Sequence, residues 1–164
     1  MTSQEGEPRS GAAHDGAALT ALRPGFGGRA AADTLALVVE DDYGSRVALT
    51  ALLERIKVAV VAADSGHAGL DVLAQRNDIA FVLMDIMMPI MDGYDTMRAV
   101  RKLPRYADLP IIAVTAKDGA GERERCIEAG ASDYIPKPIN TPELLTALAA
   151  WMTPGDAAPT KIEW

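Results

Sequence analysis

Short apolar runs alternate with longer segments of helical periodicity between residues 34 and 152. The runs have the length and continuity of strands whose two faces are both covered, as in a parallel sheet. They predict five strands, at residues 35–40, 58–62, 79–84, 111–114 and 134–135. Because strands that alternate with helices are typical of a parallel sheet with helices on both faces, the expected fold class is α/β.

Helix signals fill the segments between these runs. A first helix is marked by apolar residues at spacing i, i+3, i+4 and i+7, namely Leu49, Leu52, Leu53 and Ile56. A second helix is expected around residues 68–74. Asp92 can cap a third helix, and a fourth helix over residues 122–129 would end at Gly130.

The last helix of the pattern has its own start signal. Thr141 is the expected N-cap, and Pro142 fits the first turn, where its missing N–H would have no helical partner in any case. The residues that this helix is expected to bury are Leu144, Leu145, Leu148 and Trp151.

The two terminal segments differ from the rest of the chain. Residues 1–33 are rich in glycine and alanine, and no helical or strand period connects Leu19, Leu22 and Phe26. We therefore predict a disordered N-terminal arm over residues 1–33, one domain over residues 34–152 and a short C-terminal tail over residues 153–164.

Composition narrows the classes of protein that fit. Of the 164 residues 49% are hydrophobic and only 5% aromatic, so the chain can bury one aliphatic core. The net charge of −7 argues against binding to nucleic acid, and the length leaves no room for an added helix-turn-helix domain. We see no transmembrane run and no signal peptide, and the single cysteine, Cys126, fits a reducing compartment, so a cytoplasmic location is expected.

Charged and hydroxyl side chains follow four of the five predicted strands. They are Glu40, Asp41 and Asp42 at the end of the first strand, Asp85 at the end of the third, Thr115 at the end of the fourth and Lys137 after the fifth. The carboxyl ends of parallel strands meet at one rim of the sheet, which is where such sheets bind ligands. Each of these residues has an ordinary explanation when taken alone, as a helix cap or a solvated charge, and their joint arrival at one rim favours a functional site.

The acidic residues at this rim predict a metal site. Clustered carboxylates repel one another unless a cation lies among them, and oxygen ligands without histidine or cysteine favour Mg²⁺. We expect Asp41 and Asp85 to bind Mg²⁺, with Glu40 helping directly or through water. The backbone carbonyl of Met87 is a further candidate ligand, two residues beyond Asp85.

The same residues suggest phosphoryl transfer. A carboxylate such as that of Asp85 can attack phosphorus to form an acyl phosphate, and the protein then needs only to position and neutralise the phosphoryl oxygens. The Lys137 ammonium and the Thr115 hydroxyl are suited to that task, and the small Ala116 leaves room for the incoming group. In contrast, we interpret Cys126 as a core residue and the nearby methionines, Met87, Met88 and Met91, as packing around a turn.

The motifs that carry these residues resemble the receiver domains of bacterial response regulators and hybrid histidine kinases. In chain order the motifs are Val38-Val39-Glu40-Asp41-Asp42, residues 84–93 around Asp85, Val114-Thr115-Ala116 and Tyr134-Ile135-Pro136-Lys137-Pro138. The resemblance extends from about Leu35 to Met152. It implies a flavodoxin-like, doubly wound fold with five parallel strands in the order 2-1-3-4-5 and five helices.

The resemblance also implies a function and partners. Asp85 would accept a phosphoryl group from a histidine kinase or a histidine phosphotransfer protein, Glu40 and Asp41 would be the acidic pair that binds Mg²⁺, and Lys137 would contact the phosphate. The transfer would be catalysed by the domain itself, so the protein is expected to be a signalling switch without a DNA-binding output domain, not a separate enzyme.

Thr115 and Tyr134 would form the switch by the same resemblance. Their movement would change the surface made by the fourth helix, the fifth strand and the fifth helix, where a downstream protein, or a second copy in a possible homodimer, would bind. The Lys137–Pro138 bond resembles one that is cis in this family.

Two other functions stay open at this point. An aspartyl-phosphate phosphatase or mutase would use the same nucleophile, but such enzymes tend to carry a second aspartate where this chain has Met87. A pseudo-receiver would use the domain only for binding, although the chain retains the full set of acidic, hydroxyl and lysine residues. A nucleotide-binding protein of similar fold is disfavoured because no glycine-rich loop follows the first strand.

Overall fold

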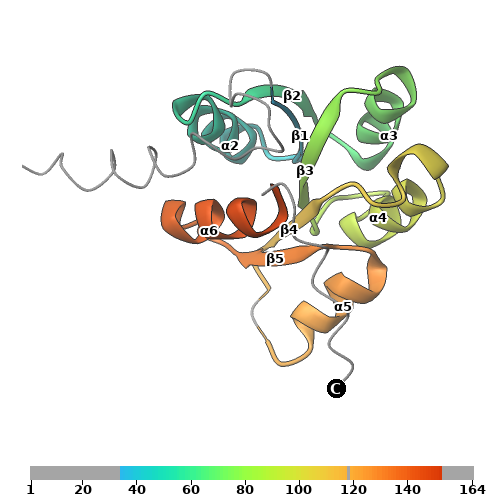
Figure 1. Cartoon of the computed structure of the whole chain (residues 1–164). Coiled ribbons are helices and arrows are strands. Elements are labelled where there is room, and N and C mark those ends of the chain that lie inside the picture. The colour runs from blue at the N-terminus through green and yellow to red at the C-terminus, as the bar shows by residue number, and fades with distance from the viewer. Residues whose placement is uncertain (1–33, 118, 153–164) are drawn as a thin grey trace, which may run out of the picture.

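The described part of the chain, residues 34–117 and 119–152 of the computed structural model, forms a parallel sheet with helices on both faces (Figure 1). The strand order is β2-β1-β3-β4-β5, and every neighbouring pair is parallel. The strands are β1 (Leu35–Val39), β2 (Ala59–Ala63), β3 (Ile79–Asp85), β4 (Ile111–Thr115) and β5 (Asp133–Pro136). The predicted fold class, strand order and strand positions are confirmed, with each strand boundary within one residue.

Five α-helices connect and follow the strands. They are α2 (Tyr43–Arg55), α3 (Gly66–Gln75), α4 (Gly93–Arg101), α5 (Glu122–Ala129) and α6 (Thr141–Met152), and a 3-10 helix (Pro104–Tyr106) lies between α4 and β4. In Figure 1, α2 and α6 cover one face of the sheet, whereas α3, α4 and α5 cover the other. Among the described helices, none is long and apolar enough to cross a membrane.

The core consists of two apolar layers that share the central strands. Side chains alternate across a strand, so Val82 and Met84 of β3 face the α3–α5 layer, while Phe81 and Leu83 face the α2–α6 layer. All of these side chains are fully buried. The sheet is therefore a rigid support, and the residues at the ends of its strands inherit fixed positions.

Local capping signals place the helix ends largely as predicted. The Asp92 side chain caps α4 by accepting a hydrogen bond from the Asp95 N–H at 2.9 Å, and Gly130 ends α5 with a left-handed φ of 119°. The predicted caps at Asp92 and Gly130 are confirmed, and so is the cis peptide bond between Lys137 and Pro138.

Two predictions for the last helix are wrong. Thr141 is the first residue of α6, and the cap comes from Asn140, whose Oδ1 accepts from the Glu143 N–H at 3.4 Å, because a cap must precede the first helical residue. Leu144, Leu145 and Leu148 are buried as expected, but Trp151 is only partly buried. Its indole Nε1 donates to Asp133 at 3.3 Å, so it lies at the edge of the sheet with its polar end bonded.

The predicted terminal arm, residues 1–33, and the predicted tail, residues 153–164, lie outside the described residues.

Arg101, the last residue of α4, joins three segments on the α3–α5 face. Its guanidinium donates to the carbonyl of Gly130 at 2.6 and 2.9 Å, to that of Leu109 at 2.6 Å and to that of Tyr106 at 3.1 Å. Burial lowers the pKa of this guanidinium. The carbonyls of Gly130 and of the segment before β4 thus share one partly buried cation as their hydrogen-bond donor.

Replacing Arg101 by methionine should therefore destabilise the fold by about 3 kcal/mol, since several carbonyls would lose a charged donor while the apolar stem is kept. Urea unfolding measures the change. Arg98→Met is the matched control, because Arg98 is exposed on the same helix and its ion pair with Asp95 at 3.1 Å should contribute less than about 1 kcal/mol. Equal losses in the two variants would contradict the assigned role of Arg101.

Candidate functional site

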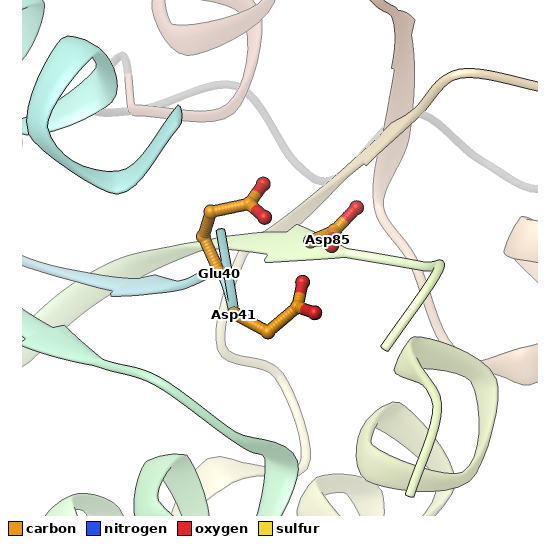
Figure 2. Close-up of side chains that lie close together, drawn as sticks. All are labelled: Glu40, Asp41 and Asp85. Carbon is orange, nitrogen blue, oxygen red and sulfur yellow. The ribbon is translucent and has the colours of Figure 1, made fainter. Parts of the chain in front are cut away.

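The ends of β1 and β3 bring three carboxylates together. Val39 pairs with Met84 in adjacent strands, so Glu40 and Asp41, which follow β1, lie beside Asp85 at the end of β3. One oxygen from each carboxylate lies within 4.8 Å of the other two. Figure 2 shows the three side chains gathered at the carboxyl ends of these strands. Glu40 and Asp85 are almost fully buried, with 1% and 3% of their surface exposed.

Lys137 reaches this group from the edge of the sheet. It follows β5, and its backbone N–H donates to the Thr115 carbonyl at 2.7 Å. Its Nζ donates to Glu40 Oε2 at 2.8 Å and to Asp85 Oδ1 at 3.2 Å. The predicted convergence of Glu40, Asp41, Asp85 and Lys137 thus exists in the structure, and the Lys137 ammonium bonds to two of the three grouped carboxylates.

The excess of negative charge changes the acidity of these groups. Burial, together with repulsion by the Glu40 carboxylate, raises the pKa of Asp85 to about 7 despite the attraction of Lys137. Burial by itself would lower the pKa of Lys137, but the hydrogen bond to Glu40 and the attraction of Asp85 outweigh it and raise that pKa. The ammonium therefore stays charged, and the site has a deficit of positive charge that a bound cation could remove.

The donor set fits Mg²⁺. The three grouped residues offer only carboxylate oxygens, which are hard ligands, and Mg²⁺ in proteins uses few carboxylates and keeps other positions for water or phosphate. Met87, whose carbonyl is the further candidate ligand, lies in the loop that follows β3. The residues present are therefore compatible with the metal that the sequence predicts.

The two predicted switch residues both contact Lys117. Thr115 ends β4 and is fully buried, and its Oγ1 accepts from the Lys117 N–H at 3.0 Å. Tyr134 lies on β5, and its hydroxyl donates to the Lys117 carbonyl at 2.8 Å. Ala116, between Thr115 and Lys117, is exposed. Lys117, which sequence reasoning did not place in the switch, is the residue that connects its two predicted members.

The loop after Asp85 is held by a close backbone contact that the sequence did not reveal. The Gly93 N–H donates to the Ile86 carbonyl at 2.9 Å, and a Cβ at Gly93 would lie 2.3 Å from the Asp85 carbonyl oxygen. Only glycine therefore fits at the start of α4. Its position after Asp92 gave a sequence signal for a helix start but not for this contact.

The prediction for the methionines holds only in part. Met88 is buried and Met91 partly buried, but the Met87 side chain is 55% exposed. The Met88 N–H bonds to the Ile86 carbonyl at 3.2 Å, which makes a tight turn centred on Met87 and directs its side chain outward.

A family model described as the response regulator receiver domain matches residues 36–149. The chain belongs to the response regulator receiver domain family. This confirms the resemblance inferred from the motifs around Glu40, Asp85, Thr115 and Lys137.

Curated relatives include both kinds of protein that the motifs resemble. The response regulator MprA of Mycolicibacterium vanbaalenii is 40% identical over 125 residues, which cover 74% of this chain and 53% of the relative. The histidine kinase BarA of Escherichia coli is 35% identical over 126 residues, 77% of this chain but 14% of the kinase. A rice two-component response regulator is 30% identical over 108 residues, and the chain spans about half the length of the two response regulators.

Solved structures support the same assignment. The receiver domain of a sensor histidine kinase from Pseudomonas aeruginosa, crystallised with a magnesium ion coordinated in its active site cleft, is 31% identical with a TM-score of 0.67, covering 73% of this chain and 97% of that domain. A Vibrio cholerae chemotaxis protein, 24% identical with a TM-score of 0.67 and covering 72% of this chain and 98% of its own, shows the fold alone.

This receiver domain also contains a buried polar cluster that the sequence did not predict. The Tyr94 hydroxyl of α4 donates to Glu122, the first residue of α5, and the Cys126 thiol donates to the same carboxylate at 3.8 Å. Cys126 is fully buried as predicted, and burial raises the pKa of its thiol to about 11. The cluster ties the start of α5 to the helix that begins at Gly93.

The raised pKa of Asp85 predicts a pH dependence of the metal-free domain. Because the folded pKa of about 7 lies above the unfolded value of 3.8, Asp85 contributes stability that is complete below about pH 4 and is lost as the pH rises through 7. Urea unfolding in EDTA between pH 5 and 8 should therefore show wild-type protein losing stability relative to Asp85→Asn. The exposed Asp95→Asn variant should follow wild type, and parallel curves for wild type and Asp85→Asn would contradict the prediction.

Proposed function

We propose that Asp85 accepts a phosphoryl group from a phosphohistidine of a histidine kinase or phosphotransfer protein in a Mg²⁺-dependent reaction. The observation that carries this proposal is the position of the Asp85 carboxylate, buried at the end of β3, hydrogen-bonded to Lys137 and grouped with Glu40 and Asp41. Receiver domains are signalling modules of two-component systems, so the phosphorylated form is the signal and no further substrate is required.

The residues divide the work of the transfer. An Asp85 carboxylate oxygen forms the new bond to phosphorus while the bond from phosphorus to the donor imidazole nitrogen breaks, and the imidazole keeps that electron pair. Lys137, already 3.2 Å from Asp85 Oδ1, offsets charge on the phosphoryl oxygens. When bound, Mg²⁺ supplies further positive charge to those oxygens, and Glu40, Asp41, Asp85 and the Met87 carbonyl would hold it.

The contacts of Lys117 support a switch at Thr115 and Tyr134. If the Thr115 hydroxyl turns to a phosphoryl oxygen, the Lys117 N–H loses its acceptor. If Tyr134 then turns inward to fill the vacated space, the Lys117 carbonyl loses its hydroxyl donor as well. Residues 115–117 then have two arrangements with different hydrogen bonds. The proposed output surface is formed by α5, β5 and α6. These elements are the fourth helix, fifth strand and fifth helix predicted from the sequence.

Exposed apolar residues around the site support a protein as the phosphoryl donor. Of the five exposed large hydrophobic side chains in the described part of the chain, four lie on the start of α2 or the loop after β3: Tyr43, Val47, Met87 and Ile90. A small-molecule donor would not need such a surface, whereas a protein that brings its phosphohistidine to Asp85 must cover it.

The proposal predicts one modification at one residue. Incubation with acetyl phosphate and Mg²⁺ should add a single phosphoryl group to wild type and none to Asp85→Asn, as measured by intact mass. Asp95→Asn, at an exposed position of α4, should be modified like wild type. Lys137→Met should slow the addition by about a hundredfold, because a charged group at the phosphoryl oxygens would be missing. An unmodified wild-type protein, or a phosphorylated Asp85→Asn variant, would contradict the proposal.

Ile90 allows a test of whether an exposed apolar residue beside the site contributes to the stability of the fold. Its side chain is 99% exposed and its φ is 71°, a left-handed conformation that disfavours β-branched residues and suits asparagine. Ile90→Asn should therefore raise the free energy of unfolding by about 1 kcal/mol, with an unchanged rate of modification by acetyl phosphate. A loss of stability in urea would show instead that Ile90 supports the fold.

A further inference from the structure

Arg46 contacts the main chain that carries two of the three carboxylates. It is the fourth residue of α2, and its side chain turns back toward the end of β1. Its Nη1 donates to the Glu40 carbonyl at 2.9 Å and to the Asp41 carbonyl at 3.2 Å. The Tyr43 ring lies against the same guanidinium, with 5.5 Å between the Arg46 Cζ and the ring centroid.

These two hydrogen bonds act where the sheet no longer constrains the chain. Strand β1 ends at Val39, so the peptide units after Glu40 and after Asp41 lie beyond the paired strand. The direction of the Asp41 side chain depends on the orientation of these two peptide units, and one guanidinium nitrogen bonds to both. The Asp42 N–H, which donates to Glu40 Oε1 at 3.0 Å, further restricts the same turn.

The restriction matters because the three carboxylates repel one another. Asp85 is buried at the end of β3, and Glu40 is buried directly after β1, where its N–H still bonds to the Ala63 carbonyl of β2 at 3.0 Å. Asp41 has no such pairing and could turn toward solvent to reduce the repulsion. A main chain fixed on both sides of Asp41 opposes that movement. It keeps the third carboxylate beside the other two before any cation arrives.

We propose that Arg46 is a positioning residue that holds the Glu40–Asp41 main chain and thereby increases the affinity of the site for Mg²⁺. This inference rests on the proposed function, because it concerns the metal of the same site. Outer contacts that orient metal ligands typically change metal affinity by about 10- to 100-fold when removed.

The positive charge of Arg46 makes the inference sharply testable. If the guanidinium acted only through its charge, its removal would lessen the repulsion of a divalent cation and would tighten Mg²⁺ binding. If it acts by holding the two carbonyls, its removal weakens Mg²⁺ binding. The two roles therefore predict changes of opposite sign for the same substitution.

The experiment measures Mg²⁺ binding by isothermal titration calorimetry at pH 8, where Asp85 is largely ionised. Arg46→Met should raise the Kd for Mg²⁺ about tenfold. Arg46→Lys keeps the charge and one flexible donor, so its Kd should lie between those of Arg46→Met and wild type. Arg98→Met, an exposed arginine of α4, is the control and should bind like wild type. Urea unfolding in EDTA measures the free energy of unfolding of Arg46→Met without metal. This free energy should change less than the free energy of Mg²⁺ binding does, which separates positioning from a general loss of structure.

An unchanged or lowered Kd in Arg46→Met would overturn the inference and leave the proposed function in place. Absence of Mg²⁺ binding by wild-type protein would overturn both. If Arg46→Met does not fold, Arg46→Gln, which keeps an amide donor but no charge, takes its place. Weaker Mg²⁺ binding by this variant supports positioning, whereas an unchanged or lower Kd contradicts it.

Discussion

The repulsion among Glu40, Asp41 and Asp85 is the constraint on which the rest of the structure depends. Three carboxylates share one rim of the sheet, and a single ammonium, that of Lys137, is bonded to two of them. A domain can keep such a group together only if the surrounding structure is rigid. Two neighbouring inner strands supply that rigidity, because β1 and β3 are buried between apolar layers on both faces of the sheet.

The rim of the sheet is rigid beside the carboxylates and held by more exchangeable contacts after β4. Gly93 lies against the Asp85 carbonyl, so the helix that follows the acceptor strand is in direct contact with it. Just beyond Thr115, by comparison, where the pairing of β4 ends, Lys117 is held by side-chain hydrogen bonds to Thr115 and Tyr134. A hydroxyl bond can be exchanged for another at small net cost, whereas a packed backbone contact cannot. This difference favours the segment after β4 as the responsive part.

How much of this could be predicted depends on whether a feature leaves a local pattern. Asp85 and Thr115 end continuous apolar runs, so the strand rule located them, and the parallel topology then brought Lys137 to the same rim. Arg101 and the Tyr94–Glu122 pair could not be found in that way. Some of their partners lie 28 to 31 positions away in the sequence, and others are backbone carbonyls of loops. Such contacts can be identified only once the chain is folded.

The errors were local and have local causes. The cap of α6 was placed one residue late because Asn140 and Thr141 are both good caps and Pro142 is accepted at either of the first positions. Periodicity placed Trp151 on the buried face but could not show that the helix reaches the sheet edge there, where the indole bonds to Asp133. The Met87 turn depends on one backbone hydrogen bond, which the residue types in this loop do not predict.

Taken together, the contacts of α5 indicate how a change at Asp85 would travel. The end of α5 is fixed, because the Gly130 carbonyl accepts two hydrogen bonds from the partly buried Arg101. At its start, the Glu122 carboxylate bonds to Tyr94 in the helix that touches Asp85, and the Glu122 N–H bonds to the Gly119 carbonyl at 3.1 Å. The preceding Lys117 bonds to the side chains of Thr115 and Tyr134. A helix fixed at one end and held by exchangeable bonds at the other can pivot but cannot translate. A phosphoryl group at Asp85 would therefore act on the output surface mainly through the first turn of α5.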